Sequence, residues 1–249
     1  MNLNKEQCSL LNTAAELFFY LRRKLKMTEK KNKQATRPVF LPNAKAPAGY
    51  YQKDITFDWE YDAKHKRINY RKNSKNMRKK FQDEYNMSLL EVSSASDCPL
   101  GKNLSAFNLT ITTKNKRFYT VEQLFQAGKV FEKAGSQIGL LKVDSKKAKQ
   151  TTAKIQKNGD KLIGFYLFGQ EFPLEPTNLF YDWLYIHALN ASELGKYCLE
   201  YDGFTDIRFN PEKQLNCQAM ACAKYECLVQ SDKLDEALKN IKTFQKLVE

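Results

Sequence analysis

The sequence predicts an α+β protein. Two segments of the first half, residues 87–95 and 106–112, have the composition of strands, and a turn at Asn115-Lys116 leads into a third short stretch at 117–119. Residues 37–42, Arg-Pro-Val-Phe-Leu-Pro, are expected to be extended, because a proline disfavours helix at the residue before it. Beyond residue 119 the apolar side chains mostly recur at helical spacing. Strands followed by a run of helices are typical of the α+β class.

The N-terminal segment differs from the rest of the chain. Residues 5–26 have one apolar face at helical spacing, and a polar stretch from Thr28 to Thr36 follows. We therefore predict a helical extension and linker over residues 1–36 and a main domain over residues 37–249. No apolar run approaches the roughly 20 residues of a membrane span. The N-terminus also lacks the apolar core and cleavage site of a signal peptide, so we expect a cytoplasmic protein with no membrane partner.

The cysteines and histidines predict no metal site. The six cysteines form no CxxC pair, and Cys217, Cys222 and Cys227 are five residues apart, which on a helix turns them away from a common face. His65 and His187, the chain's two histidines, are far from these cysteines in the sequence. We expect free thiols, no bound metal and no cofactor.

The net charge of +13 is concentrated in the first third of the chain. Residues 1–83 contain 20 Lys and Arg against 8 Asp and Glu, a balance of +12 that leaves +1 for the remainder. The densest block, residues 64–80, has nine basic residues and no acidic one, with Tyr70 inside it. Such a block can neutralise phosphates while its aromatic rings stack on bases, although an isolated run of this kind is also typical of a solvated face. We predict nucleic-acid contacts by its basic members, which are Lys64, Lys66, Arg67, Arg71, Lys72, Lys75, Arg78, Lys79 and Lys80.

One predicted helix combines a buried stripe with a polar face. Thr120 and Gln123 have the spacing of a capping box, which places the start of the helix at residue 121. Apolar residues follow at positions 121, 124, 125, 128 and 131, and Gly135 is a suitable stop. Glu122, Gln126 and Lys129 would share a second face, with the acid and the base about 10 Å apart along the axis.

That second face could hold a ligand between an anion and a cation. The helix dipole favours the ionised form of Glu122 in the first turn. A carboxylate suits the stabilisation of an oxocarbenium-like transition state or the activation of a water. The alternative is an ordinary stable helix, which also uses an acid near its start and a lysine near its end.

Several of these segments resemble one family. The segment Leu104-Ser105-Ala106-Phe107-Asn108, followed by Thr120-Val121-Glu122, Phe125-Gln126-Ala127 and Lys129, is similar to the signature of the NADAR (YbiA-like) superfamily. Phe204-Thr205-Asp206, Phe209-Asn210 and Asn216 fit the second half of that signature. The arrangement of RPVFLP, FYDWLY and FTDIRFNP resembles the NADAR branch found beside guanine-specific DarT-type toxins. The resemblance runs from about Arg37 to Phe244.

The resemblance implies a fold and an activity. The fold is compact and largely helical with a small antiparallel sheet, so residues 37–249 are expected to be a catalytic domain. The activity is that of an antitoxin hydrolase, which removes ADP-ribose from guanine in DNA and undoes the modification made by a DarT-type partner toxin. Glu122 and Asp206 match acidic positions of the family. Lys129 matches a lysine that either binds charge or attacks the anomeric carbon as an amine.

The resemblance also implies a binding pocket, with one departure from the family pattern. Residues expected to line an ADP-ribose pocket are Ser105, Phe107, Asn108, Gln126 and Asn216. The Gly-rich loop that usually follows the second acid is absent, since residues 207–211 contain no glycine. Asn210, Pro211 and Glu212 have the pattern of a helix start, so we predict a helix there whose N-terminus binds phosphate. Arg208 either joins that contact or points to solvent, and Phe107 or Phe209 would stack on a base.

The segment 180–187 adds two candidates. Phe180 and Leu184 lie on a helical stripe and are expected in the core, whereas Tyr181 and Asp182 lie off it and are candidates to reach the pocket.

Two other functions remain open on the sequence alone. One is an N-glycosidase of the same fold that acts on free nucleotide-like metabolites, and the other is a noncatalytic module that binds nucleic acid or a toxin.

Overall fold

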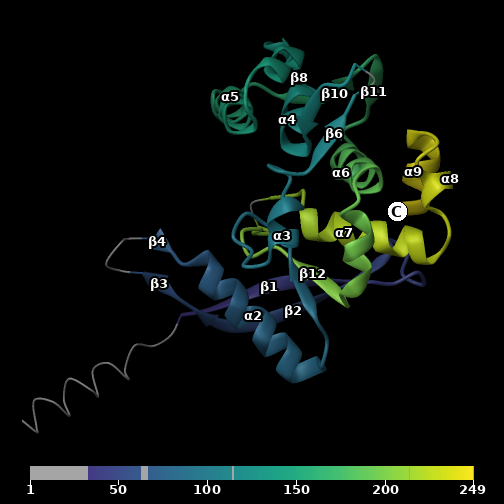
Figure 1. Ribbon diagram of the computed structural model, residues 1–249. Helices are drawn as coiled ribbons and strands as arrows, with labels where there is room; N and C mark the ends of the chain where they lie inside the picture. The colour runs from purple at the N-terminus through teal and green to yellow at the C-terminus, as the bar shows by residue number, and fades with distance from the viewer. Residues whose placement is uncertain (1–32, 63–66, 114, 213, 249) are drawn as a thin grey trace, which may run out of the picture.

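The computed structural model describes residues 33–62, 67–113, 115–212 and 214–248 (Figure 1). The helix predicted over residues 5–26 lies outside the described residues, as does most of the predicted linker. The last four linker residues, 33–36, belong to strand β1 (Lys33–Pro42). This strand continues through the Arg-Pro-Val-Phe-Leu-Pro segment, which is extended as predicted.

The first sheet joins strands from both ends of the described chain. Its order is β2 (Tyr50–Trp59), β1, β12 (Gly203–Thr205) and β5 (Leu89–Glu91). The β1–β2 and β1–β12 pairs are antiparallel, whereas β12 and β5 are parallel, so this sheet is mixed rather than purely antiparallel. Of the strand predicted over residues 87–95, only the three residues of β5 pair. The parallel pair places the residue after β12 beside the end of β5.

Helices cover both faces of this sheet. Helix α2 (Tyr70–Tyr85) packs on one face and α7 (Gln218–Gln230) on the other (Figure 1). Successive residues of β1 point to opposite faces, so Val39 packs in the core beneath α2 and Phe40 in the larger core that contains α7. The side chains of both residues are fully buried. Burial on both faces holds the end of β12 in a fixed position.

A second, antiparallel sheet lies on the far side of the molecule. Its order is β11 (Gln170–Phe172), β10 (Leu162–Leu167), β8 (Lys129–Phe131) and β9 (Gly135–Ser136). Helix α4 (Val121–Ala127) packs against α5 (Ser145–Lys157) and α6 (Leu179–Ala191) beside it. The other elements are β3 (Tyr61–Asp62), β4 (Arg67–Ile68), α3 (Pro99–Asn103), β6 (Thr110–Thr112), β7 (Phe118–Thr120), η1 (Ile138–Lys142), η2 (Gly195–Glu200), α8 (Leu234–Ala237) and α9 (Ile241–Val248). Helices packed on small sheets confirm the α+β class.

The helix predicted over residues 121–134 is shorter than expected. Thr120 caps it as predicted, since its hydroxyl accepts a hydrogen bond from the amide of Gln123 at 3.1 Å. The helix ends at Ala127, and residues 129–131 pair with β10 instead of continuing the helix. Gly128 lies between the helix and the strand. It packs so closely against Phe180 that a Cβ at this position would lie 2.6 Å from the ring. The expected stripe is still buried, but Phe131 reaches the core from a strand.

The expected core residues of α6 are confirmed. The rings of Phe180 and Phe165 lie 4.6 Å apart, and Leu184 is also buried. The hydroxyl of Tyr185 donates a hydrogen bond to the carbonyl of Leu104 at 2.5 Å, which ties α6 to the end of α3. This hydrogen bond between two elements restricts the position of the segment 104–108.

Three further findings concern the described residues alone. Cys98, Cys198, Cys217, Cys222 and Cys227 are free thiols, as predicted, and the sixth cysteine, Cys8, lies outside the described residues. Among the residues that the structure describes, no three His, Cys, Asp or Glu side chains come together as a metal site. No helix in the described part of the chain has the length and apolar character needed to cross a membrane.

Candidate functional site

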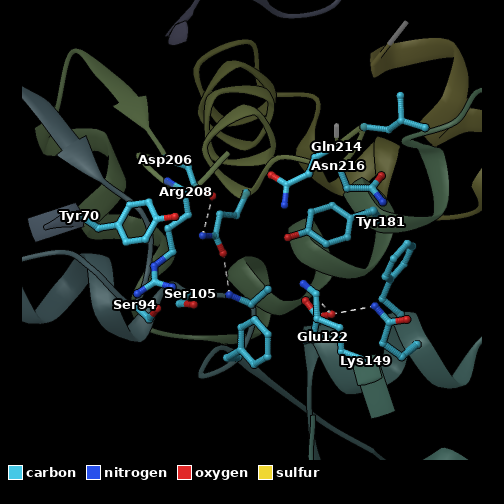
Figure 2. Close-up of a pocket in the computed structure, with 16 residues that line it drawn as sticks. Tyr70, Ser94, Ser105, Glu122, Lys149, Tyr181, Asp206, Arg208, Gln214 and Asn216 are labelled. Carbon is cyan, nitrogen blue, oxygen red and sulfur yellow. Dashed lines mark hydrogen bonds and ion pairs between the residues drawn. The ribbon is translucent and has the colours of Figure 1, made fainter. Parts of the chain in front are cut away.

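A cavity of about 560 Å³ opens between α2, the loop after β12, α4 and α5. Its volume lies in the range of about 300–1,000 Å³ that small-molecule sites occupy. Figure 2 shows Glu122 and Lys149 on a different wall from Asp206 and Arg208. Eight residues that the sequence analysis proposed for the site line this cavity, namely Ser105, Phe107, Glu122, Gln126, Tyr181, Asp206, Arg208 and Asn216.

The Glu122 carboxylate is held at the start of α4. The amide of Glu122 donates to the carbonyl of Ala106 at 2.9 Å, which joins this helix to the 105–107 loop. Glu122 as a whole is 5% exposed, and its side chain accepts a hydrogen bond from Nε2 of Gln126 at 2.7 Å. Nζ of Lys149, from α5, lies 3.3 Å from the same carboxylate oxygen. The Glu122 carboxylate therefore faces the cavity with one amide donor and one cation beside it.

The Asp206 carboxyl comes from the residue directly after β12. It is 8% exposed, and its two oxygens accept hydrogen bonds from the amide of Arg208 and from Nε2 of Gln218, both at 2.9 Å. Oε1 of Gln218 in turn accepts from the amide of Ala106 at 2.9 Å. Gln218 therefore fixes Asp206 relative to the same loop that contacts α4. Burial raises the pKa of Asp206, although these hydrogen bonds oppose the rise.

A second buried carboxyl, Glu91, lies behind Asp206. It is the last residue of β5, has no exposed surface, and accepts hydrogen bonds from the amide of Ile207 at 3.1 and 3.2 Å and from the hydroxyl of Ser93. Burial raises its pKa strongly, and the neighbouring charge of Asp206 raises it further. The two carboxyls thus form a pair that retains a proton near neutral pH.

One family model matches the chain over residues 35–249, and its description is the DarT1-associated NADAR antitoxin. The chain belongs to this NADAR family. The match covers more than four fifths of the chain and includes every residue that lines the cavity. No protein with curated annotation matches the chain. The resemblance that the sequence motifs indicated is therefore confirmed at the level of the family.

Lys129 differs from its predicted position in this NADAR protein. It belongs to β8 rather than to the helix of Glu122, and it does not line the cavity. Its side chain is 8% exposed, with Nζ 5.1 Å from the ring centroid of Phe125. Burial lowers the pKa of Lys129 to about 8, while the Glu122 charge raises it. The cation that faces the cavity beside Glu122 is instead Lys149.

Four other expected pocket residues also lie outside the cavity lining, namely Asn108, Asp182, Phe209 and Asn210. Asp182 is buried and forms an ion pair with Lys224 at 2.8 Å, which joins α6 to α7. The ring of Phe209 is buried, with its centroid 6.4 Å from that of Phe40, so it is unavailable to stack on a base. Asn108 is exposed and donates from Nδ2 to the carbonyl of Lys102 at 2.7 Å.

The helix predicted at Asn210-Pro211-Glu212 is absent. Oδ1 of Asn210 accepts from the amide of Glu212 at 3.0 Å, which closes a turn, but the next helix among the described residues is α7, which begins at Gln218. The described residues of this turn therefore provide no helix N-terminus for a phosphate. Arg208 does line the cavity, with its guanidinium 4.8 Å from the ring centroid of Tyr70.

Only some of the basic residues predicted to contact nucleic acid are described and exposed without an acidic partner. Lys64 and Lys66 lie outside the described residues, and Arg67 is in β4. Three of the basic residues in α2 already have acidic partners: Lys72 with Glu60 at 2.8 Å, Arg78 with Asp97 at 2.5 Å, and Lys80 with Glu84 at 3.6 Å. Arg71, Lys75 and Lys79 are exposed on the same helix. Helix α2 borders the cavity through Tyr70, so its basic surface adjoins the site.

Sequence reasoning missed several lining residues. Lys149 is one of many lysines in α5, and nothing in its spacing distinguishes it from the others. Gln218 reaches the site through hydrogen bonds to Ala106 and Asp206, which no local pattern reveals, and Ser94 also lines the cavity. Tyr70 lies inside the basic block of residues 64–80, and an aromatic ring among basic residues is the signal in the sequence that indicates a role at the site.

Proposed function

We propose that this NADAR protein hydrolyses the N-glycosidic bond between ADP-ribose and guanine in DNA, and that it acts as the antitoxin of a DarT-type ADP-ribosyltransferase. The observation that carries the proposal is that Glu122 and Asp206, 84 residues apart, face one cavity from different elements. Their partners differ in kind, since Glu122 pairs with a cation and Asp206 is buried beside a second carboxyl. Such differences divide the roles of base and acid between two carboxyls.

Asp206 is the proton donor in this scheme. Burial raises its pKa to about 6, which is closer to neutral pH than that of an ordinary aspartate and suits a group that gives up and regains a proton in each turnover. As the bond between the anomeric carbon and the guanine nitrogen breaks, both of its electrons pass to the nitrogen, and Asp206 supplies the proton. The guanine base then leaves unmodified.

Glu122 acts at the sugar. Its carboxylate stabilises the positive charge that develops on the ring oxygen and anomeric carbon. A water molecule bonds to that carbon and passes one proton to Glu122. Free ADP-ribose is the second product, and transfer of the proton from Glu122 through solvent to Asp206 restores the starting state.

Other cavity residues fit the rest of the ligand. Oδ1 of Asn216 is buried and has no hydrogen-bond partner among the described residues, so it can accept from a bound group. The Phe107 ring is 38% exposed at the cavity and can stack on a base. The Arg208 guanidinium supplies a charge-assisted donor for phosphate. We assign Lys129 to charge support behind Glu122, because an amine outside the lining is poorly placed to attack the sugar.

The test uses a DNA oligonucleotide with one ADP-ribosylated guanine. We expect the wild-type protein to release ADP-ribose and restore the guanine, measured by mass spectrometry of both products. Glu122→Gln and Asp206→Asn should each lower kcat/KM by about 100-fold or more, the usual contribution of an acid or base. Glu132→Gln, which removes an exposed carboxyl outside the cavity, is the matched control.

Three results would contradict the proposal. Equal release by the wild type and by Glu122→Gln would remove Glu122 from the mechanism. Protection of cells from a DarT-type toxin by both carboxyl variants, without any release of ADP-ribose by the wild type, would favour a noncatalytic binding module. Release from free nucleotides but not from DNA would favour the metabolite hydrolase.

A further inference from the structure

A second cavity adjoins the first. It has a volume of about 390 Å³ and shares Tyr70, Ser94 and Arg208 with the first cavity. These three residues stand together on one side of the close-up in Figure 2. A ligand in the first cavity could therefore extend past them into the second without leaving the protein surface.

The lining of the second cavity is positively charged. Arg71 from the start of α2, Lys102 from α3 and Arg208 from the loop after β12 all line it, and no acidic residue does. No ion pair among the described residues involves Arg71, Lys102 or Arg208. The acidic residue next to Ser96, Asp97, is already paired with Arg78. Three cations from three separate elements therefore face one hollow that contains hydroxyl donors but no carboxylate.

We propose that this second cavity binds the backbone phosphates of the nucleic-acid strand that carries the modified guanine. This inference rests on the proposed function. The guanine is covalently attached to the strand, so a strand phosphate must lie close to the cavity that holds the sugar. Lysine and arginine side chains that contact phosphates position a strand without reading its sequence.

The two cavities separate reaction from strand binding. The first contains both carboxyls, Glu122 and Asp206, and is large enough for a ligand of cofactor size. The second contains only basic and neutral groups. It opens beside the exposed face of α2, where Lys75 continues the basic surface. The arrangement favours a polynucleotide over a modified nucleoside, because a nucleoside has no backbone phosphate for the second cavity.

The test compares a cavity variant with a matched control. Arg71→Gln with Lys102→Gln removes two cations from the second cavity, and Lys239→Gln with Lys242→Gln removes the same charge from exposed positions near the C-terminus. The first measurement is the binding of an unmodified single-stranded oligonucleotide, followed by fluorescence anisotropy at several salt concentrations. We expect the cavity variant to bind at least about tenfold more weakly and its salt slope to fall by about 1.4, since each phosphate contact on a single strand contributes about 0.7. The control should bind as the wild type does.

The second measurement compares two substrates, an ADP-ribosylated oligonucleotide and ADP-ribosylated deoxyguanosine, which has no backbone phosphate. The cavity variant should lose about tenfold in kcat/KM on the oligonucleotide and stay within about twofold on the nucleoside. Equal losses on both would overturn the inference, because the cavity would then bind the diphosphate of ADP-ribose.

The two measurements separate this inference from the proposed function. If the wild type hydrolyses neither substrate, the proposed function fails, and the anisotropy result still decides the role of the cavity. Unchanged affinity and salt slope in the cavity variant would overturn the inference whatever the activity.

Discussion

Replacing Glu91 with glutamine tests the carboxyl pair beneath the cavity. Glu91 is fully buried, and its pKa is raised by burial and by Asp206. The folded protein therefore keeps the Glu91 proton at pH values where the unfolded chain, with a glutamate of ordinary pKa near 4.5, has lost it. Glu91→Gln has nearly the same shape, keeps an acceptor for the amide of Ile207 and cannot ionise.

The sign and size of the effect follow from proton linkage. In this pH range the unfolded state binds one proton fewer than the folded state, so the free energy of unfolding falls as pH rises. The slope is about 1.4 kcal/mol per pH unit for one proton. The contribution is fully present below the ordinary pKa and is lost as pH rises through the raised pKa. The variant lacks this loss, so its stability advantage over the wild type should grow by about 2 kcal/mol between pH 5.5 and pH 7.

Urea denaturation at a series of pH values measures this difference directly. Subtracting the wild-type curve from the variant curve removes the titration of every group that does not interact with Glu91. Glu132→Gln, at an exposed position, should give a difference that does not change with pH. Parallel curves for Glu91→Gln and the wild type would refute a buried, proton-retaining Glu91.

Three further predictions concern the lysines around the site. Lys224→Met leaves the Asp182 carboxylate without its 2.8 Å ion-pair partner in the core, so unfolding free energy measured in urea should fall by about 3–5 kcal/mol, and a loss below about 1 kcal/mol would contradict the pair's importance. Lys149→Gln removes the half-exposed cation beside Glu122 and should lower kcat/KM about tenfold while changing stability by less than about 1 kcal/mol; unaltered kinetics would exclude that role. Borohydride added during turnover should trap no adduct, and a trapped ADP-ribose at Lys129 would show that this amine attacks the sugar.

The sequence predicted the start of α4 but not its end. The Thr120 cap is a local signal, and it forms as expected. Phe131 fits the helical stripe and a strand equally well, and the pairing of its segment with β10, more than 30 residues away in the sequence, decides for the strand. The close approach of Phe180 to Gly128 is likewise a contact between distant segments. Local periodicity reveals neither contact, so the prediction that Lys129 lies on the helix of Glu122 is wrong.

The helix expected after Asp206 failed for a different reason. Asn210 and Pro211 are good start signals, and Asn210 does accept a bond from the chain ahead. The described residues just after them, Gln214 and Leu215, are exposed and bury no apolar face. A short helix without packing is unstable, because the first turn orders several residues for one hydrogen bond. The capping signals of Asn210 and Pro211 are therefore not sufficient to form a helix.

The acidic residues of the site were predicted through the family resemblance, whereas their supports were not. Glu122 and Asp206 belong to recognisable segments, and both face the cavity. Gln218, which ties Asp206 to the 105–107 loop, and Glu91, which lies behind it, act only through the folded structure. Their roles depend on β12 pairing with both β1 and β5, which no motif in the chain specifies.

The most direct test of the two-carboxyl site is single-turnover release of ADP-ribose from modified DNA, with protein in excess and affinity measured separately. If Glu122 and Asp206 perform the chemistry in one cavity, Glu122→Gln and Asp206→Asn will slow release by at least about 100-fold while their affinity for the modified DNA stays within about tenfold. Unchanged release, or a loss explained entirely by weaker binding, would contradict this account.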